Sequence, residues 1–197
     1  MIFGVNLLIA IEGIDGSGKT SQAFLAKNDF KARQLKFPDY RTMPQIREFL
    51  EGRVHIHPKS LFLMYLADIC QGIYNIDHEH SLIILDRYIY STVAYARSIG
   101  KETAMDIVER IAPPVPDAVF WIDVGIDTAM ERKANHKLPD RNEKDVDLLT
   151  EVRSAYETMF SRRFYAKQWF RIDGNRNIQQ VYNEIKPVLE GIVKGGQ

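Results

Sequence analysis

Residues 12–21 of this chain, EGIDGSGKTS, form a glycine-rich stretch between an apolar run and a helix-forming segment. Residues 13–20 match the pattern G-x-x-x-x-G-K-[ST] at every specified position. The preceding run, 7–11, is typical of a buried parallel strand, and 21–27 can form a helix. A strand, a glycine loop and a helix in this order present backbone N–H groups and the positive end of a helix dipole to an anion. The stretch therefore predicts a phosphate-binding loop.

Two side chains of this loop have chemistry that suits a nucleotide. Lys19 can reach terminal phosphates, and the Thr20 hydroxyl can ligate Mg²⁺. The alternative is a glycine-rich turn that binds nothing, but the pattern arises by chance in roughly one chain of this length in a hundred. We therefore predict that ATP phosphates bind to the whole loop, which consists of Gly13, Ile14, Asp15, Gly16, Ser17, Gly18, Lys19 and Thr20.

Composition excludes several classes of partner. The 197 residues, enough for one domain, include 26 basic and 26 acidic residues, so no basic excess indicates a nucleic-acid partner. No run of 18 apolar residues predicts a membrane span. The single cysteine, Cys70, cannot form an intrachain disulfide, which fits a reducing compartment. We expect a cytoplasmic protein that binds neither nucleic acid nor membranes.

Short apolar runs alternate with helix-forming segments along the chain. The predicted strands are 7–11, 35–37, 82–86, 117–124 and 170–173. This alternation predicts an α/β fold in which a parallel sheet is covered by helices on both faces. We see no repeat or linker, so residues 1–197 are expected to form a single domain.

The strand 82–86 ends in an aspartate. A carboxylate inside a sheet would be costly, but Asp86 at the carboxyl end can face the crevice where parallel sheets bind ligands. We predict that Asp86 belongs to a magnesium site. The alternative is a surface pair formed by Asp86 and the next residue, Arg87.

A basic segment interrupted by proline follows the predicted helix 127–134. The simplest explanation of such a segment is a solvated face. We favour a lid over phosphates, at about 132–143, because the protein is neutral overall and these groups are concentrated in one short loop. The basic or titratable residues of the segment are Arg132, Lys133, His136, Lys137 and Arg141.

Four motifs in order resemble those of thymidylate kinases, a branch of the nucleoside monophosphate kinases. They are EGIDGSGKT at 12–20, FPDY at 37–40, DRYIYSTVAY at 86–95 and DRNE at 140–143. The resemblance covers essentially the whole chain, and the third motif is the most specific. The resemblance implies a P-loop fold with five parallel strands, a homodimer, and Mg²⁺-dependent transfer of a phosphoryl group from ATP to dTMP.

The resemblance also implies roles for individual residues. Asp15 matches the aspartate near the acceptor 3′-hydroxyl and the magnesium shell, and Arg87 the arginine that holds the acceptor phosphate. Tyr65 lies where a ring stacks on thymine, in an acceptor region of about 38–76. Tyr95 matches the ring beside the 2′-position, which favours deoxyribose.

The remaining implied contacts come from the motifs and the last turn. Phe37 and Tyr40 are similar to residues that line the acceptor site, and Ser91 and Thr92 to a base-recognition turn. The lid and adenine-side contacts implied are Arg141, Glu143 and Gly174. Arg141 is also a candidate catalytic cation, together with Lys19 and Arg87.

The chain departs from the family pattern at two positions. Ile69 stands where the family often has an arginine that donates to thymine, which leaves a kinase for another nucleoside or monophosphate as an alternative. Gly16 stands where some members carry a basic residue, so the lid is expected to supply that cation. A second alternative, an ATP-binding regulator without transfer activity, would have no reason to keep Arg87.

Overall fold

The computed structural model describes residues 7–76, 80–134 and 146–195. The strands are β1 (Leu7–Glu12), β2 (Arg33–Lys36), β3 (Leu82–Asp86), β4 (Ala118–Asp123) and β5 (Trp169–Asp173). The helices are α1 (Lys19–Phe30), α2 (Pro44–Leu50), α3 (Pro58–Tyr74), α4 (Ile89–Ala94), α5 (Lys101–Ile111), α6 (Ile126–Ala134), α7 (Val146–Ser161) and α8 (Ile178–Gly195). None of these helices is long and apolar enough to cross a membrane.

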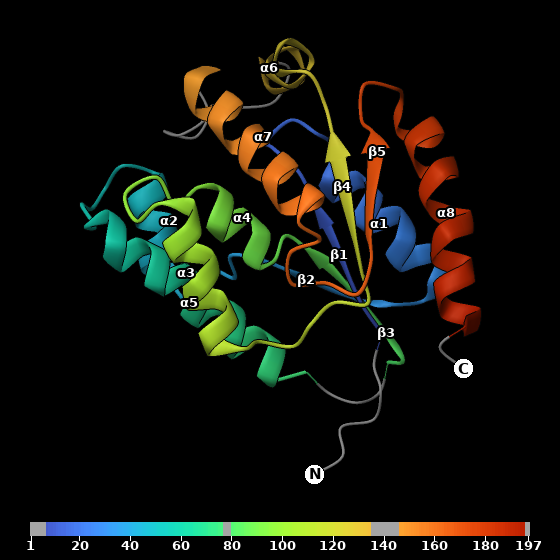
Figure 1. The fold of residues 1–197 in the computed structure, drawn as a ribbon, viewed down its shortest axis with the longest axis horizontal. Helices are drawn as coiled ribbons and strands as arrows, with labels where there is room; N and C mark the ends of the chain where they lie inside the picture. Colours follow the sequence, from blue (N-terminus) through green and yellow to red (C-terminus); the bar gives the residue numbers. More distant parts are fainter. Residues whose placement is uncertain (1–6, 77–79, 135–145, 196–197) are drawn as a thin grey trace.

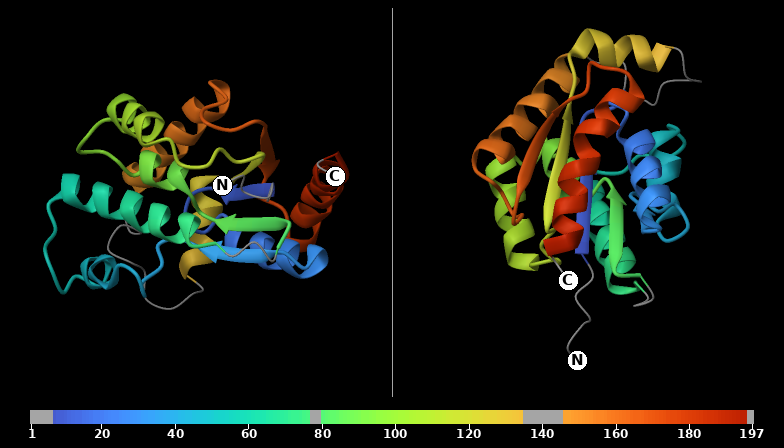
Figure 2. Two further views of the ribbon diagram at one scale, coloured as in Figure 1. Left: turned by 90° about the horizontal axis from the view of Figure 1, so that it is seen from below. Right: turned by 90° about the vertical axis from the view of Figure 1, so that its right-hand side faces the viewer.

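The five strands form one parallel sheet in the order β2-β3-β1-β4-β5. Helices α3, α4, α5 and α7 cover one face, and α1 and α8 cover the other (Figures 1 and 2). The two faces follow from strand alternation, because Leu8 and Ala10 pack in one cluster and Ile9 and Ile11 in the other. The predicted α/β fold and all five strands are confirmed, with ends that differ by one or two residues.

Three helices begin in different ways. Asn177 caps α8, since its Oδ1 accepts a hydrogen bond from the Gln180 N–H at 2.9 Å. Met43 occupies the N-cap position of α2, and the Thr42 hydroxyl donates to Asp68. Asp127 lies within the first turn of α6 and does not precede the helix.

The carboxyl end of β4 is held by an ion cluster in which the carboxylate is buried and the two arginine side chains are partly exposed. Asp123 accepts hydrogen bonds from Arg153 Nε at 2.6 Å and from Arg171 Nη2 at 2.7 Å. Burial alone would raise the pKa of the Asp123 carboxyl, but the two guanidinium groups outweigh it and lower that pKa. Because Arg153 lies on α7 and Arg171 on β5, the cluster ties the helix that follows the basic segment to the sheet.

Asp123→Asn is expected to lower the free energy of unfolding at pH 7 by about 1–2 kcal/mol, because the negative charge is lost and one of the two acceptor oxygens becomes an NH₂ donor that faces a guanidinium group. A carboxyl whose pKa is lowered by folding stabilises the protein above its unfolded pKa, about 3.9, and loses that effect as pH falls through the folded pKa. The gap between wild type and variant should therefore narrow from pH 7 towards pH 2. Chemical denaturation at several pH values measures it, and a gap that stays constant would contradict the assignment.

Candidate active site

The glycine-rich loop joins β1 to α1 at the carboxyl edge of the sheet. Gly16 and Gly18 have φ of +83° and +89°, in the left-handed region that glycine adopts without strain. Gly18 directly precedes α1, so the unpaired N–H groups of the first helical turn face the loop. A side chain cannot replace Gly16, because its Cβ would lie 2.3 Å from the Ala129 carbonyl oxygen of α6. The loop is thus built against α6.

A cavity of about 870 Å³ lies over this loop. The predicted ATP-binding residues that line it are Asp15, Gly16, Ser17, Gly18, Lys19, Thr20 and Gly174. The other two predicted loop residues, Gly13 and Ile14, do not line the cavity: both are buried, and the Ile14 carbonyl accepts a hydrogen bond from Lys19 Nζ at 3.1 Å. Arg176 and Asn177 also line this cavity and add polar groups to its wall.

A second cavity, of about 550 Å³, lies on the α3 and α4 side of the loop. Every acceptor-side residue predicted within the described part of the chain lines it: Asp15, Phe37, Tyr40, Tyr65, Arg87, Ser91, Thr92 and Tyr95. Residues that are 58 positions apart, such as Phe37 and Tyr95, therefore share one wall. The two cavities have Asp15, Lys19 and Thr20 in common, so they meet at the phosphate-binding loop.

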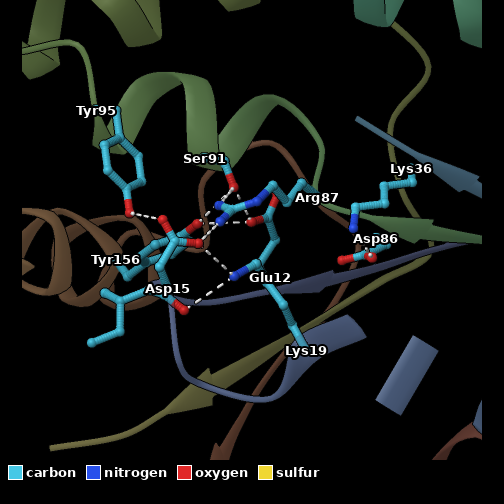
Figure 3. Close-up of polar contacts among 10 residues, drawn as sticks. Glu12, Asp15, Lys19, Lys36, Asp86, Arg87, Ser91, Tyr95 and Tyr156 are labelled. Atoms are coloured by element: carbon cyan, nitrogen blue, oxygen red, sulfur yellow. Dashed lines mark hydrogen bonds and ion pairs between the residues drawn. The ribbon is translucent and has the colours of Figure 1, made fainter. Parts of the chain in front are cut away.

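Charged groups converge where the cavities meet (Figure 3). Arg87 Nη2 forms an ion pair with Asp15, and Lys19 Nζ lies 3.2 Å from the same carboxylate. Burial alone would raise the pKa of Asp15, but the charges of Arg87 and Lys19 outweigh it and hold the pKa well below its ordinary value. Burial would lower the pKa of Arg87, and Asp15 reverses that effect, so the guanidinium stays charged. The Lys19 pKa is lowered by burial and by Arg87.

Hydroxyl groups complete the acceptor side of this cluster. Tyr95 OH donates to Asp15 Oδ2 at 3.2 Å, and Arg87 Nη1 donates to Ser91 Oγ at 3.0 Å. Burial raises the pKa of the Tyr95 phenol, which therefore stays protonated and remains a donor. Asp15 is thus held from three directions, and its position relative to the second cavity is defined.

The proposed magnesium ligands have different surroundings. Asp86 is fully buried, and among the described residues neither of its carboxylate oxygens has a hydrogen-bond partner. Its neighbour is Lys36, whose Nζ lies 3.9 Å away across the β2–β3 pair. Thr20 is exposed and lines both cavities. Asp86 lines neither cavity, and among the described residues it forms an ion pair with Lys36. Both of its oxygens still lack a hydrogen-bond donor within the described part of the chain, and carboxylate and hydroxyl oxygens are ligands of the type that Mg²⁺ prefers, so the donor set of Asp86 and Thr20 fits that ion.

The described part of the predicted lid lies at the end of α6, which lies across the end of the sheet (Figure 2, right). Arg132 donates to the carbonyl oxygens of Gly174 at 2.8 Å and Arg176 at 3.1 Å, so it holds the loop after β5 in place. Lys133 lines the first cavity, and its charge acts on Asp15. The other predicted lid residues, His136, Lys137, Arg141 and Glu143, lie outside the described residues.

Three residues of the site were missed in the sequence. Glu12 is fully buried beneath the cluster, Tyr156 of α7 donates to it at 2.7 Å, and Lys36 lines the second cavity. Glu12 could have been found, because it ends an apolar strand as Asp86 does. Lys36 and Tyr156 carry no local signal, since their relevance depends on which strands and helices become neighbours.

Known proteins with similar sequences support one family. The thymidylate kinase family model matches residues 11–185. A thymidylate kinase from Thermosipho africanus is 34% identical over 200 residues, covering 93% of this chain and 98% of that protein. A probable thymidylate kinase from Methanocaldococcus jannaschii is 33% identical over 192 residues, covering 95% and 97%.

A solved structure agrees on the fold. The thymidylate kinase of Candida albicans superposes with a TM-score of 0.77, covering 94% of this chain and 92% of that one, at 24% identity. At that identity the match supports the arrangement of sheet and helices alone. The family model and the sequence relatives extend it to the reaction class, a phosphotransferase that acts on nucleotides. This chain belongs to the thymidylate kinase family of nucleoside monophosphate kinases.

Proposed function

We propose that this chain transfers the terminal phosphoryl group of ATP to dTMP, forming ADP and dTDP, at the point where its two cavities meet. The observation that carries the proposal is that Asp15, Lys19 and Thr20 line both cavities. ATP would occupy the cavity over residues 13–20, with adenine towards Gly174. The nucleotide monophosphate would occupy the other, within the acceptor region 38–76 and the α4 motif.

Positive charge is the main requirement of this reaction. Phosphoryl transfer depends chiefly on position and electrostatic stabilisation, and the acceptor phosphate is already an anion, so we assign no residue as a general base. Lys19 would contact the donor phosphates and Arg87 the acceptor phosphate. The pKa of Arg87 is raised by Asp15, which keeps the guanidinium charged throughout.

The proposal includes a Mg²⁺ ion near the point where the two cavities meet. Thr20, Asp86 and Asp15 are the residues that would hold the ion. When bound, the ion supplies positive charge that offsets the negative charge of the phosphate oxygens. No cluster of three carboxylate, histidine or cysteine side chains exists among the residues that the structure describes, so water and phosphate oxygens would complete the ligand set.

Lys133 is our candidate for the lid cation. Gly16 leaves no space for a basic side chain in the loop, because α6 packs directly on it. Of the two described lid cations, Arg132 is engaged by backbone carbonyl groups, whereas the charge of Lys133 acts on Asp15. The end of α6 would therefore supply the charge that the loop lacks.

Lys133→Met is expected to lower kcat about 100-fold, because one cation facing the transferring group is lost. Lys133→Arg keeps the charge and should retain most of the activity. Steady-state kinetics with ATP and dTMP measure both variants. If Lys133→Met turns over at the wild-type rate, the role of lid cation would instead be assigned to a residue in 135–145.

The acceptor can be identified with an ADP-release assay against dTMP, dUMP, UMP, dCMP and thymidine. We expect dTMP to be turned over fastest, because Arg87 requires an acceptor phosphate and Tyr65 offers a ring to the base. UMP should be slower, since Tyr95 packs beside Asp15 where a ribose 2′-hydroxyl would need room. Turnover of thymidine without turnover of dTMP would contradict the proposal, as would ADP release that no acceptor increases.

We propose a homodimer formed through α3. This helix exposes Leu63 (55%) and Tyr74 (58%), with Ala67 between them on the same stripe. Leu63→Arg should convert the dimer to a monomer, because burying the guanidinium without a partner is costly. Light scattering after size-exclusion chromatography measures the mass, and a wild-type monomer at micromolar concentration would contradict the proposal.

We also place the enzyme in the cytoplasm as part of this proposal. Cys70 is half-buried and cannot form an intrachain disulfide, because it is the only cysteine in the chain. Burial raises the pKa of its thiol, which keeps it protonated and unreactive. A protein without disulfides that uses ATP fits a reducing compartment.

A further inference from the structure

Glu12 is a fully buried carboxylate at the end of β1 with three donors converging on it. Oε1 accepts from the Tyr88 N–H at 2.6 Å, and Oε2 accepts from Ser91 Oγ at 2.6 Å and Tyr156 OH at 2.7 Å. These donors come from the β3–α4 junction, α4 and α7, as Figure 3 shows for the two side chains. Glu12 does not line either cavity, so it does not meet the nucleotides directly.

These contacts lead to Arg87, that of Tyr156 through Ser91, because the Tyr156 OH lies 3.0 Å from Ser91 Oγ. The Arg87 backbone has φ of +72°, in the left-handed region that non-glycine residues rarely adopt. Glu12 accepts a hydrogen bond from the N–H of the next residue, Tyr88. The carboxylate therefore holds the backbone immediately after Arg87, the residue with the unfavourable conformation. The side chain is held as well, because Arg87 Nη1 donates to Ser91 Oγ, which in turn donates to Glu12.

We infer that Glu12 is the positioning residue for Arg87, fixing its backbone through the Tyr88 N–H and its guanidinium through the Ser91 hydroxyl. This inference rests on the proposed role of Arg87 in phosphoryl transfer to dTMP. Without Glu12, the guanidinium would keep its charge but lose the orientation that presents it to the second cavity. The effect is therefore on the rate of transfer and not on ATP binding.

An amide in place of the carboxylate changes the polarity of one contact. In Glu12→Gln, one oxygen can still accept from the Tyr88 N–H. The amide nitrogen then stands in place of Oε2, so the Ser91 and Tyr156 hydroxyls lose the acceptor to which both of them donate, and the Ser91 hydroxyl that accepts from Arg87 Nη1 is no longer anchored by residue 12. Arg87 should lose its fixed direction while the volume of the buried side chain stays the same.

Glu12→Gln is expected to lower kcat at least tenfold and to leave the KM for ATP within twofold. The decisive test is a double-mutant cycle with Arg87→Ala, measured by single-turnover transfer from ATP to dTMP. If Glu12 acts through Arg87, the tenfold loss should disappear in the Arg87→Ala background. A loss that is equal in both backgrounds would overturn the inference.

Asp123→Asn provides the matched control. Asp123 is a buried carboxylate at the end of the adjacent strand β4, but its partners are Arg153 and Arg171. In the double variant with Arg87→Ala, the fold-loss of rate caused by Asp123→Asn should multiply with the fold-loss caused by Arg87→Ala. The wild-type rate with dTMP separates the two ideas: an inactive wild type refutes the proposed function, whereas an active wild type without coupling refutes only the role of Glu12.

Tyr156→Phe keeps the test possible if Glu12→Gln does not fold. It removes one donor from Glu12 and retains the ring, which stacks on Trp121 at 6.1 Å between centroids. We expect a threefold to tenfold loss of kcat that again disappears in the Arg87→Ala background. An unchanged kcat, or a loss that persists without the Arg87 side chain, would overturn the inference.

Discussion

Lys19→Met is expected to reduce phosphoryl transfer at least 1,000-fold while the protein remains folded. Methionine keeps the buried aliphatic part of the side chain, so packing at the start of α1 is retained. What is lost is the ammonium group, which lies 3.2 Å from Asp15 at the boundary of both cavities. Because the reaction brings anionic phosphates together, removal of that charge raises the barrier directly.

The same substitution at Lys27 is the control. Lys27 lies on the same helix, but it is exposed in the last turn, and turnover of Lys27→Met should match that of wild type. Initial rates of ADP formation and thermal unfolding curves measure both variants. Near-normal turnover of Lys19→Met with an intact fold would remove the basis for assigning the loop to ATP.

Arg87→Ala is expected to lower kcat about 1,000-fold with little change in the affinity for ATP. The Arg87 guanidinium lines the second cavity and not the cavity over the loop, so the binding of ATP should be unaffected. Cationic clamps of this kind contribute about 10³–10⁵ in rate in phosphoryl transfer. Alanine has a Cβ as arginine does, so the left-handed backbone at this position is under the same constraint in both proteins.

Arg87→Lys tests whether charge alone is sufficient. Lysine carries the charge on one nitrogen, so it cannot reproduce the two separate contacts that Arg87 makes with Ser91 and Asp15. We expect the kcat of Arg87→Lys to lie between that of wild type and that of Arg87→Ala. Titration of ATP binding by fluorescence, with kcat measured separately, distinguishes the outcomes. An equal fall in ATP affinity and kcat for Arg87→Ala would show that the residue does not act on the acceptor side.

Much of the fold was predictable because its signals are local. The apolar runs that became β1, β3 and β4 are continuous and buried on both faces, as parallel strands between helix layers must be. The glycine pattern 13–20 likewise depends on neighbouring residues alone, and it lies where the sequence predicts. Contacts between distant residues carry no such local signal, as with the hydrogen bond that the Thr42 hydroxyl donates to the Asp68 carboxylate, 26 positions away.

The candidate site was predictable where a motif names its residues. The FPDY and DRYIYSTVAY motifs identified Phe37, Tyr40, Arg87 and Tyr95, and the structure brings all four to one cavity. The packing that makes a motif residue necessary was not predictable. Gly16, for example, must be a glycine because α6 packs on it, and this contact joins Gly16 to Ala129, 113 positions away.

Sequence alone identified the loop, the parallel α/β architecture and the family, because each depends on short patterns that the chain carries without reference to its partners. The strand order β2-β3-β1 was supplied by the folded chain, and it brings Lys36 opposite Asp86 and Glu12 beneath Arg87. These pairings determine which buried charges are compensated. They arise from long-range packing of the sheet and helices, for which no local pattern of residues is diagnostic.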